Sequence, residues 1–195
     1  ARMARWLAEA GRACGEGDEA VRAIIEEIRG EEVWLRARLE GSTAPATRCL
    51  VFSHNDLQAG NIMEVDGRMV FIDYEYAGPN PAAYDLANHF CERMADYHSE
   101  TPHVLDFSKY PGEELRRTFT EDYLQGLPGG GGGTPVREEV EGLADAAHRF
   151  AAASHAFWAV WGCIKAITED CHDFDYLGYA QGRLGLYRKW KADIV

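Results

Sequence analysis

The chain has 195 residues, of which 46% are hydrophobic and 11% aromatic, and this composition fits one folded domain and excludes a disordered or fibrous chain. The net charge of -12 disfavours nucleic acid as a partner, because phosphate backbones are bound by clustered Lys and Arg, and it fits a cationic ligand better. The 5 Cys residues are scattered without a CxxC pair, which favours reduced thiols and a cytoplasmic protein, and no apolar run approaches the roughly 20 residues of a membrane span.

The first part of the chain is expected to be helical and then to form short strands. Apolar residues at helical spacing predict helix across residues 6–40, which Gly41-Ser42-Thr43-Ala44-Pro45 should end. Short strands are predicted at 49–53, 61–65 and 69–72, and Asp66-Gly67 marks a hairpin turn between the last two.

The remainder is expected to be mostly helical. Gly78-Pro79-Asn80-Pro81 should break the chain, after which residues 84–98 carry apolar residues at helical spacing. Further helices are predicted at residues 112–124, 136–168 and 176–191. Pro128 and the following glycines predict a flexible linker at 128–134. The predicted class is therefore α+β and mostly helical, with a small β-hairpin element.

The most informative motif is HNDLQAGN at residues 54–61, which is followed after the hairpin by FIDYEY at residues 71–76. The spacing H-x-D-x4-N, with a further Asp after the next hairpin, is the arrangement that kinase-like enzymes use. In that arrangement Asp56 accepts a substrate hydroxyl proton, and Asn61 and Asp73 supply oxygen ligands to Mg²⁺. A solvated turn is the structural alternative for Asp56 taken alone.

Residues around this motif carry weaker predictions. His54 is expected mainly to brace the loop. Gln58 and Glu75 flank the predicted metal ligands and could bind Mg²⁺ directly or through water, or lie on the surface, and both alternatives stay open. Asp85, near the start of a predicted helix, is expected to act as an N-cap or loop brace.

An aromatic pair on the helix predicted at 136–168 suits a cationic ligand. A quaternary ammonium cannot donate hydrogen bonds, so its site needs aromatic faces and a carboxylate. Trp158 and Trp161 lie three residues apart and share a helix face. Without further information, such a pair on an Ala-rich helix is more often part of the core than of a cation cage.

Several longer stretches resemble the choline/ethanolamine kinase family: HNDLQAGNI at 54–62, IDYEYA at 72–77 and YDLANHFCE at 84–92. Residues 97–106 look most like the plant choline kinases. The resemblance covers most of the chain and implies the C-terminal lobe of the protein-kinase-like fold. It also implies ATP- and Mg²⁺-dependent phosphorylation of the choline hydroxyl to phosphocholine, a step of phospholipid biosynthesis toward phosphatidylcholine through the cytidine-diphosphate route.

The resemblance further implies a substrate pocket in which Asp56 reaches the choline hydroxyl. Its aromatic and acidic walls would be Tyr76, Glu92, Tyr97, Trp158, Trp161 and Tyr179. Tyr74 is expected to belong to the core.

The chain also departs from the family pattern. Kinases of this type carry a glycine-rich loop and a strand Lys before the catalytic loop, and neither precedes His54. Gly129 to Gly133 follow the catalytic loop and are predicted to be a linker. Residues 1–195 are therefore expected to form a single C-terminal catalytic and choline-binding lobe without the nucleotide lobe, nearly inactive alone.

Alternative functions remain open. An ethanolamine kinase would bind a primary ammonium, and an aminoglycoside-type phosphotransferase would need a wide acidic cleft without the aromatic cage. A non-catalytic choline-binding or interaction module would bind choline without ATP. The expected partners are choline or ethanolamine and ATP, and a homodimer is a possible assembly.

Overall fold

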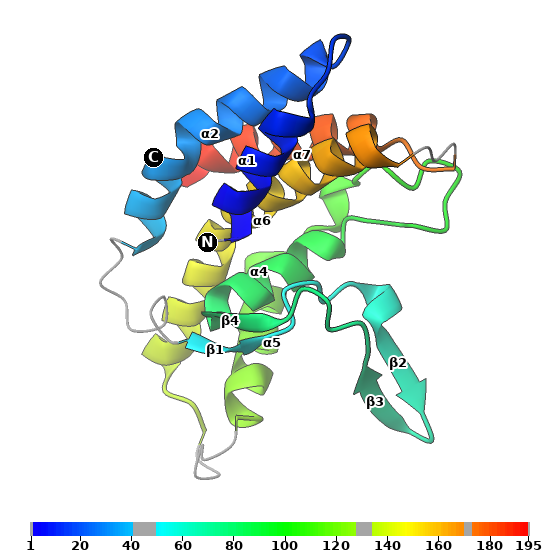
Figure 1. Cartoon of the computed structure of the whole chain (residues 1–195). Helices are drawn as coiled ribbons and strands as arrows, with labels where there is room; N and C mark the ends of the chain where they lie inside the picture. Colours follow the sequence, from blue (N-terminus) through cyan, green and yellow to red (C-terminus); the bar gives the residue numbers. More distant parts are fainter. Residues whose placement is uncertain (1, 41–49, 128–133, 170–172, 195) are drawn as a thin grey trace. The chain divides into compact units, whose positions relative to one another are not determined.

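The computed structural model describes residues 2–40, 50–127, 134–169 and 173–194, and these residues form helices with two short antiparallel strand pairs (Figure 1). The α+β, mostly helical class is thus confirmed. The chain divides into two compact units. The helical unit comprises Ala1–Gly41, Ala95–Asp106 and Ala152–Val195, and the catalytic-loop unit comprises Ser42–Met94 and Phe107–Ala151.

The helical unit is built from α1 (Arg2–Ala13), α2 (Glu19–Glu40), the second half of α6 (Arg137–Thr168) and α7 (Tyr176–Ile194). The helix predicted across 6–40 is confirmed over most of that range, but the chain turns between α1 and α2. Gly17 has a φ of 101°, a conformation open to glycine. The carboxylate of Asp18 accepts a hydrogen bond from Gly15 N at 2.8 Å and fixes this turn.

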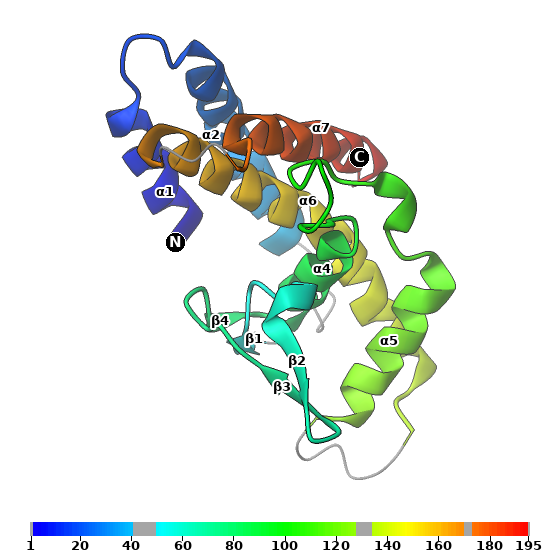
Figure 2. The ribbon, with the colours of Figure 1, turned by 90° about the vertical axis from the view of Figure 1, so that its right-hand side faces the viewer.

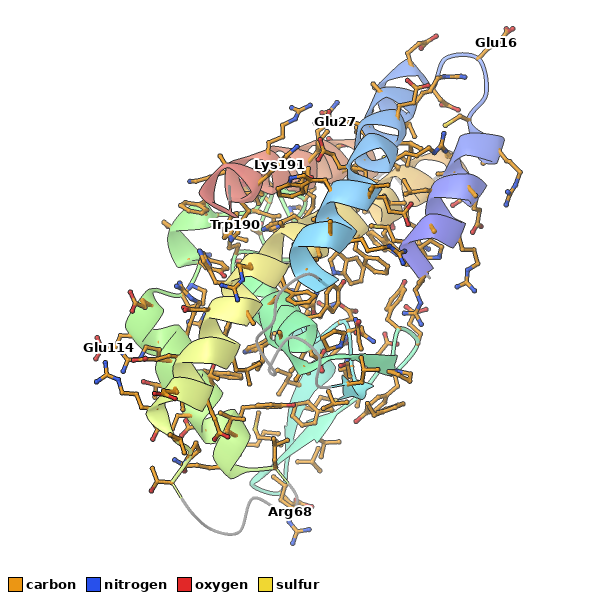
Figure 3. All side chains as sticks on the ribbon, turned by 90° about the vertical axis from the view of Figure 1, so that its left-hand side faces the viewer. Glu16, Glu27, Arg68, Glu114, Trp190 and Lys191 are labelled. Atoms are coloured by element: carbon orange, nitrogen blue, oxygen red, sulfur yellow. The ribbon has the colours of Figure 1, made fainter. Side chains whose placement is uncertain are left out.

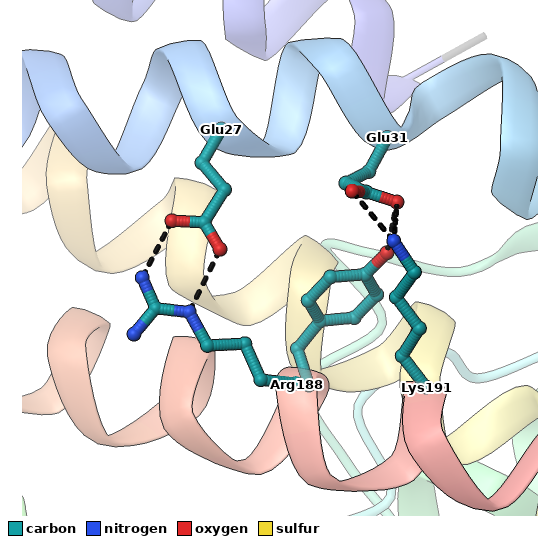
Figure 4. A network of polar contacts seen from close by, with 5 residues as sticks. Glu27, Glu31, Arg188 and Lys191 are labelled. Atoms are coloured by element: carbon teal, nitrogen blue, oxygen red, sulfur yellow. Dashed lines mark hydrogen bonds and ion pairs between the residues drawn. The ribbon is translucent and has the colours of Figure 1, made fainter.

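Charged side chains join α2 to α7 along one side of the helical unit (Figure 4). Arg188 donates from Nε and Nη2 to the carboxylate of Glu27 at 2.7 and 2.6 Å. Lys191 Nζ donates to both oxygens of Glu31 at 2.7 and 2.6 Å, and the Tyr187 hydroxyl donates to the same carboxylate at 3.0 Å. The hydrogen bond from Arg188 lowers the pKa of Glu27.

Despite this geometry, the Glu27–Arg188 pair is expected to contribute little to stability. The side chains are 34% and 60% exposed, so water and salt screen their attraction. In a double-mutant cycle with Glu27→Gln and Arg188→Gln, the coupling energy measured by urea unfolding should stay below about 1 kcal/mol. It should fall further in 1 M salt, where the Debye length is about 3 Å. A coupling of several kcal/mol would contradict the screening argument.

The catalytic-loop unit holds both strand pairs and shorter helices (Figure 2). Its elements in chain order are β1 (Leu50–Ser53), η1 (Ala59–Asn61), β2 (Ile62–Val65), β3 (Arg68–Phe71), β4 (Gly78–Pro81), α4 (Ala82–Glu92), η2 (Phe107–Lys109), α5 (Glu113–Gln125) and the first half of α6. β1 pairs with β4, β2 pairs with β3, and α4 packs against β1 and β4. The loop that follows β1 therefore begins next to α4.

The predicted hairpin is confirmed. Asp66 and Gly67 have φ values of 51° and 73°, as the turn between twisted antiparallel strands requires, and Arg68 follows at the hairpin tip (Figure 3). Two other predictions are wrong. Residues 78–81 form strand β4 instead of a simple break, and the helix predicted at 84–98 ends at Glu92, so Tyr97 does not lie on it.

Some predictions fall outside the described residues. These are the linker at 128–134 apart from Thr134, the helix end at 41–45, Cys49 and Cys171. Among the described cysteines, Cys14, Cys91 and Cys163 are not joined in disulfides. One described helix, α6, is long and apolar enough to cross a membrane by length and composition, but 67% of its most apolar window is buried within the protein, as in a core helix.

Candidate active site

The loop from His54 to Asn61 places Asp56 and Asn61 in direct contact. Both are buried, with 6% of their surface exposed. Asn61 Nδ2 donates to the Asp56 backbone oxygen at 2.9 Å and to Asp56 Oδ2 at 3.2 Å. Because these bonds use the nitrogen of the Asn61 side chain, its amide oxygen remains a candidate ligand for a cation.

The segment after β3 lies alongside this loop. Ile72 N donates to Asn61 O at 3.0 Å, which extends the hairpin pairing to the residue before Asp73. His54 Nε2 donates to Ile72 O at 2.8 Å, and Asn55 Nδ2 donates to Tyr76 O at 2.9 Å. Asp73 itself has a φ of 60°, a left-handed conformation that Asp tolerates better than most residues. The backbone therefore brings Asp73 close to Asn61.

Helix α4 holds the loop from the other side. Asp85 accepts hydrogen bonds from His54 N at 2.9 Å and from Asn55 N at 2.7 Å, so its role as a loop brace is confirmed. It is not the N-cap of α4, which is Pro81 without a side-chain hydrogen bond. Asn88 Oδ1 accepts from Leu57 N at 2.8 Å.

Burial raises the pKa of Asp56 to about 6. The neighbouring Glu92 carboxylate, itself buried, adds to this rise by charge repulsion, as Asp73 does to a smaller extent. A hydrogen bond from Gln58 and the charge of His54 act in the opposite direction. A carboxylate whose pKa lies near neutral pH is suited to take a proton from a substrate hydroxyl.

The donor set fits Mg²⁺ better than a softer metal. Mg²⁺ prefers oxygen ligands and is usually held by one or two carboxylates together with substrate phosphates. Asn61 and Asp73 offer an amide oxygen and a carboxylate on adjoining segments. Within the described part of the chain, no group of three or more His, Cys, Asp or Glu side chains could hold a metal ion by itself. Gln58 is half-buried beside Asp56, and Glu75 is exposed.

Aromatic rings gather in the helical unit between the second half of α6 and the start of α7. The Trp161 ring centroid lies 5.5 Å from that of Trp158, 5.6 Å from Tyr176 and 5.8 Å from Tyr179, all close to edge-to-face. Phe174 lies 4.9 Å from Tyr176. Trp158 and Tyr179 are buried, whereas Trp161 is half-buried. Cationic groups of the chain already lie over two of these rings, with Lys165 Nζ 5.8 Å from the Trp161 centroid and Arg183 Cζ 5.0 Å from the Tyr179 centroid.

Phe174 and Tyr176 also belong to this aromatic cluster and were not predicted as members of it. Their proximity to Tyr179 along the chain was a signal that could have identified them. Tyr97, from residues 95–106, lies 6.4 Å from Phe174 and so belongs to the same cluster. The core assignment of Tyr74 is wrong, because this side chain is 52% exposed and lies 4.9 Å from the His54 ring.

Tyr76 and Glu92 belong to the catalytic-loop unit, and Tyr97, Trp158, Trp161 and Tyr179 to the helical unit. The aromatic group is assembled within the helical unit. A single pocket formed from both groups stays a prediction.

Gly162 sets the spacing of α6 and α7 beneath the aromatic rings. A Cβ added there would lie 3.0 Å from Tyr176 O and 3.1 Å from Tyr179 Cδ1. Gly162→Ala is therefore expected to lower the free energy of unfolding by about 1 kcal/mol net and to alter tryptophan fluorescence. Gly182→Ala is the matched control on α7, because nothing lies within 4 Å of its added Cβ. This control should stabilise the chain by up to about 1 kcal/mol in urea unfolding. Equal stabilisation by both variants would contradict the close approach.

Comparison with known proteins gives a consistent result. The model of the family described as "Choline/ethanolamine kinase" matches residues 2–188. The chain is 41% identical to "Probable choline kinase 3" of Arabidopsis thaliana over 100% of its own length and 54% of that protein. It is 36% identical to "Ethanolamine kinase 1" of Mus musculus, over 86% of this chain and 44% of that protein.

A solved structure is also similar over nearly the whole chain. The crystal structure of a choline kinase from Cryptosporidium parvum matches with a TM-score of 0.83 and 29% identity, and the match covers 98% of this chain and 56% of that one. The chain thus spans about half the length of the proteins that it matches.

Proposed function

Because the chain belongs to the choline/ethanolamine kinase family, we propose that it forms the substrate and metal half of an enzyme that phosphorylates the choline hydroxyl with ATP. The observation that carries this proposal is the buried Asp56, which Asn61 contacts directly and whose pKa is raised to about 6. The proposal includes the product phosphocholine, its use in phosphatidylcholine synthesis, a cytoplasmic location and a possible homodimer.

In this mechanism Asp56 would accept the hydrogen bond of the choline hydroxyl and take its proton as the oxygen attacks the γ-phosphorus, while the bond from that phosphorus to the β-phosphate oxygen breaks and ADP leaves. Asn61 and Asp73 would hold Mg²⁺, which neutralises charge on the phosphate oxygens when bound. Glu92 would contribute negative charge toward the quaternary ammonium. In the helical unit, Tyr97, Trp158, Trp161 and Tyr179 would offer ring faces to an ammonium group, and in the catalytic-loop unit Tyr76 would do so. Each ring face would be worth about 0.5 to 2 kcal/mol.

We propose that these 195 residues alone transfer little phosphate. Before β1, the described residues form only the helices α1 and α2, so no strand Lys or glycine-rich loop among them can hold the nucleotide. Positioning contributes about 7 to 11 kcal/mol to well-oriented reactions, and a loosely held ATP would lose much of that contribution. Appreciable formation of phosphocholine by the purified chain would contradict this part of the proposal.

The test is isothermal titration of the purified chain with choline, ethanolamine and Mg·ATP in parallel. Choline binding without nucleotide binding would support a preformed substrate half. Failure of choline to bind, with or without ATP, would contradict a choline site in this chain.

Ethanolamine is the second candidate substrate, since a relative named "Ethanolamine kinase 1" matches at 36% identity over 86% of the chain. A primary ammonium relies more on hydrogen-bond acceptors than on ring faces. Trp161→Leu should therefore weaken choline binding more than ethanolamine binding if choline is the natural ligand. An equal loss for both ligands would favour ethanolamine.

A further inference from the structure

One face of α4 follows the backbone of the catalytic loop. Residues Asp85, Asn88, His89 and Glu92 are spaced at i, i+3, i+4 and i+7, so they share that face. Asp85 binds the amides of His54 and Asn55. The next two side chains, Asn88 and His89, reach the residue that follows Asp56.

Leu57 is held on both of its backbone polar groups. Its N–H donates to Asn88 Oδ1 at 2.8 Å. Its carbonyl oxygen lies 2.9 Å from His89 Nδ1. A carbonyl can only accept, so Nδ1 carries the proton and the imidazole donates. The side chains of α4 therefore fix the peptide groups on both sides of Leu57, and one of these groups joins Asp56 to Leu57.

Both clamping side chains are themselves held in place. Asn88 is fully buried, and its Nδ2 has no hydrogen-bond partner among the described residues. The hydrogen bond that its Oδ1 accepts from Leu57 N therefore explains why an amide side chain stands at this position. The His89 ring stacks on Phe119 of α5 with centroids 4.9 Å apart. Burial lowers the pKa of His89, which keeps the imidazole neutral at neutral pH. Within the described residues, both side chains bond to the backbone of Leu57, so they act on Asp56 through Leu57.

We propose that Asn88 and His89 are positioning residues, which direct the Asp56 carboxylate toward the substrate hydroxyl by clamping the backbone of Leu57. This inference rests on the proposed function. It predicts that loss of the clamp weakens recognition of the hydroxyl and leaves recognition of the ammonium group intact. A role in folding alone would weaken binding of all ligands together.

The test compares choline with ethyltrimethylammonium, which has the same ammonium group but lacks the hydroxyl. The unsubstituted chain should bind choline about tenfold more tightly, which corresponds to 1.4 kcal/mol, as expected for a hydrogen bond to a charged acceptor. In His89→Leu the preference should fall to about twofold or less, while the affinity for ethyltrimethylammonium changes little. His89→Asn, which can place an N–H near the position of Nδ1, should retain most of the preference, and His89→Gln, whose amide reaches further, should not.

Two further variants keep the test independent of folding. Asn88→Asp retains the acceptor oxygen and Asn88→Leu removes it, so the first should keep more of the preference for choline. His148→Leu is the matched control, because His148 bonds to the Tyr110 hydroxyl in the same unit. This variant should keep the full preference for choline over ethyltrimethylammonium. Amide exchange at Leu57 should accelerate in His89→Leu and Asn88→Leu only.

The outcomes separate the two proposals. If the unsubstituted chain binds neither ligand, the proposed function fails, and the positioning role fails with it. If the chain prefers choline and His89→Leu keeps that preference, the positioning role is overturned while the proposed function stands.

Discussion

Asp85→Ala is expected to lower the free energy of unfolding by about 2 to 5 kcal/mol, the largest loss predicted for a single side chain of the catalytic-loop unit. The Asp85 carboxylate accepts both backbone N–H groups of His54 and Asn55, at 2.9 and 2.7 Å. These residues are only 6% and 7% exposed, so water cannot readily replace the lost acceptor. Each buried N–H left without a partner costs about 1 to 3 kcal/mol.

The isosteric variant sharpens this test. Asp85→Asn keeps the shape but offers one oxygen, so its NH₂ group would face one of the two amides as donor against donor. It should therefore lose nearly as much stability as Asp85→Ala. Asp122→Ala, at an exposed position on α5, is the control and should change stability by less than about 0.5 kcal/mol. Urea unfolding measures these values, and amide exchange at His54 and Asn55 shows whether the loss is local. Full recovery by Asp85→Asn would refute the two-acceptor argument.

Local signals in the sequence were sufficient for the hairpin and for the contact between Asp56 and Asn61. Asp66-Gly67 favours the two positive φ angles of the turn, and this choice fixes the register from Ile62↔Phe71 to Val65↔Arg68. The short interval from Asp56 to Asn61 then closes through η1, whose backbone begins the pairing with Ile72. Such contacts depend on neighbours in sequence, so a motif can predict them.

Contacts between distant segments could not be predicted in the same way. Pro79 and Pro81 disfavour a strand, yet residues 78–81 pair with β1 because a two-stranded ribbon leaves each strand with a free edge. Met94 and Tyr97 continue the apolar spacing of α4, but the helix ends at Glu92. The burial of Asp56, and the alignment of Asn88 and His89 with Leu57, depend on where α4 packs. That packing has no local signature in the sequence.

The carboxyl group of Asp56 should make the metal-free chain less stable as the pH rises. Its pKa is raised from 3.8 to about 6 in the folded state, chiefly by burial and then by Glu92. Between about pH 4 and pH 6 the folded chain thus binds more protons than the unfolded chain, and its stability falls with rising pH. The penalty is absent below pH 4 and complete above pH 6, where a shift of about two units corresponds to about 3 kcal/mol.

Asp56→Asn removes this charge while keeping an oxygen that can accept from Asn61 Nδ2. It should therefore stabilise the chain by up to about 3 kcal/mol at pH 7.5 in EDTA and by almost nothing at pH 4. Urea unfolding of both proteins across this range isolates the contribution of Asp56 together with its coupling to Glu92, His54 and Asp73, because groups that do not interact with Asp56 cancel in the difference. Asp145→Asn, at an exposed position on α6, is the control and should give a flat difference. If the stability difference for Asp56→Asn were also independent of pH, the Asp56 carboxylate would be ionised at little cost in free energy. The environment proposed for a catalytic base would then be wrong.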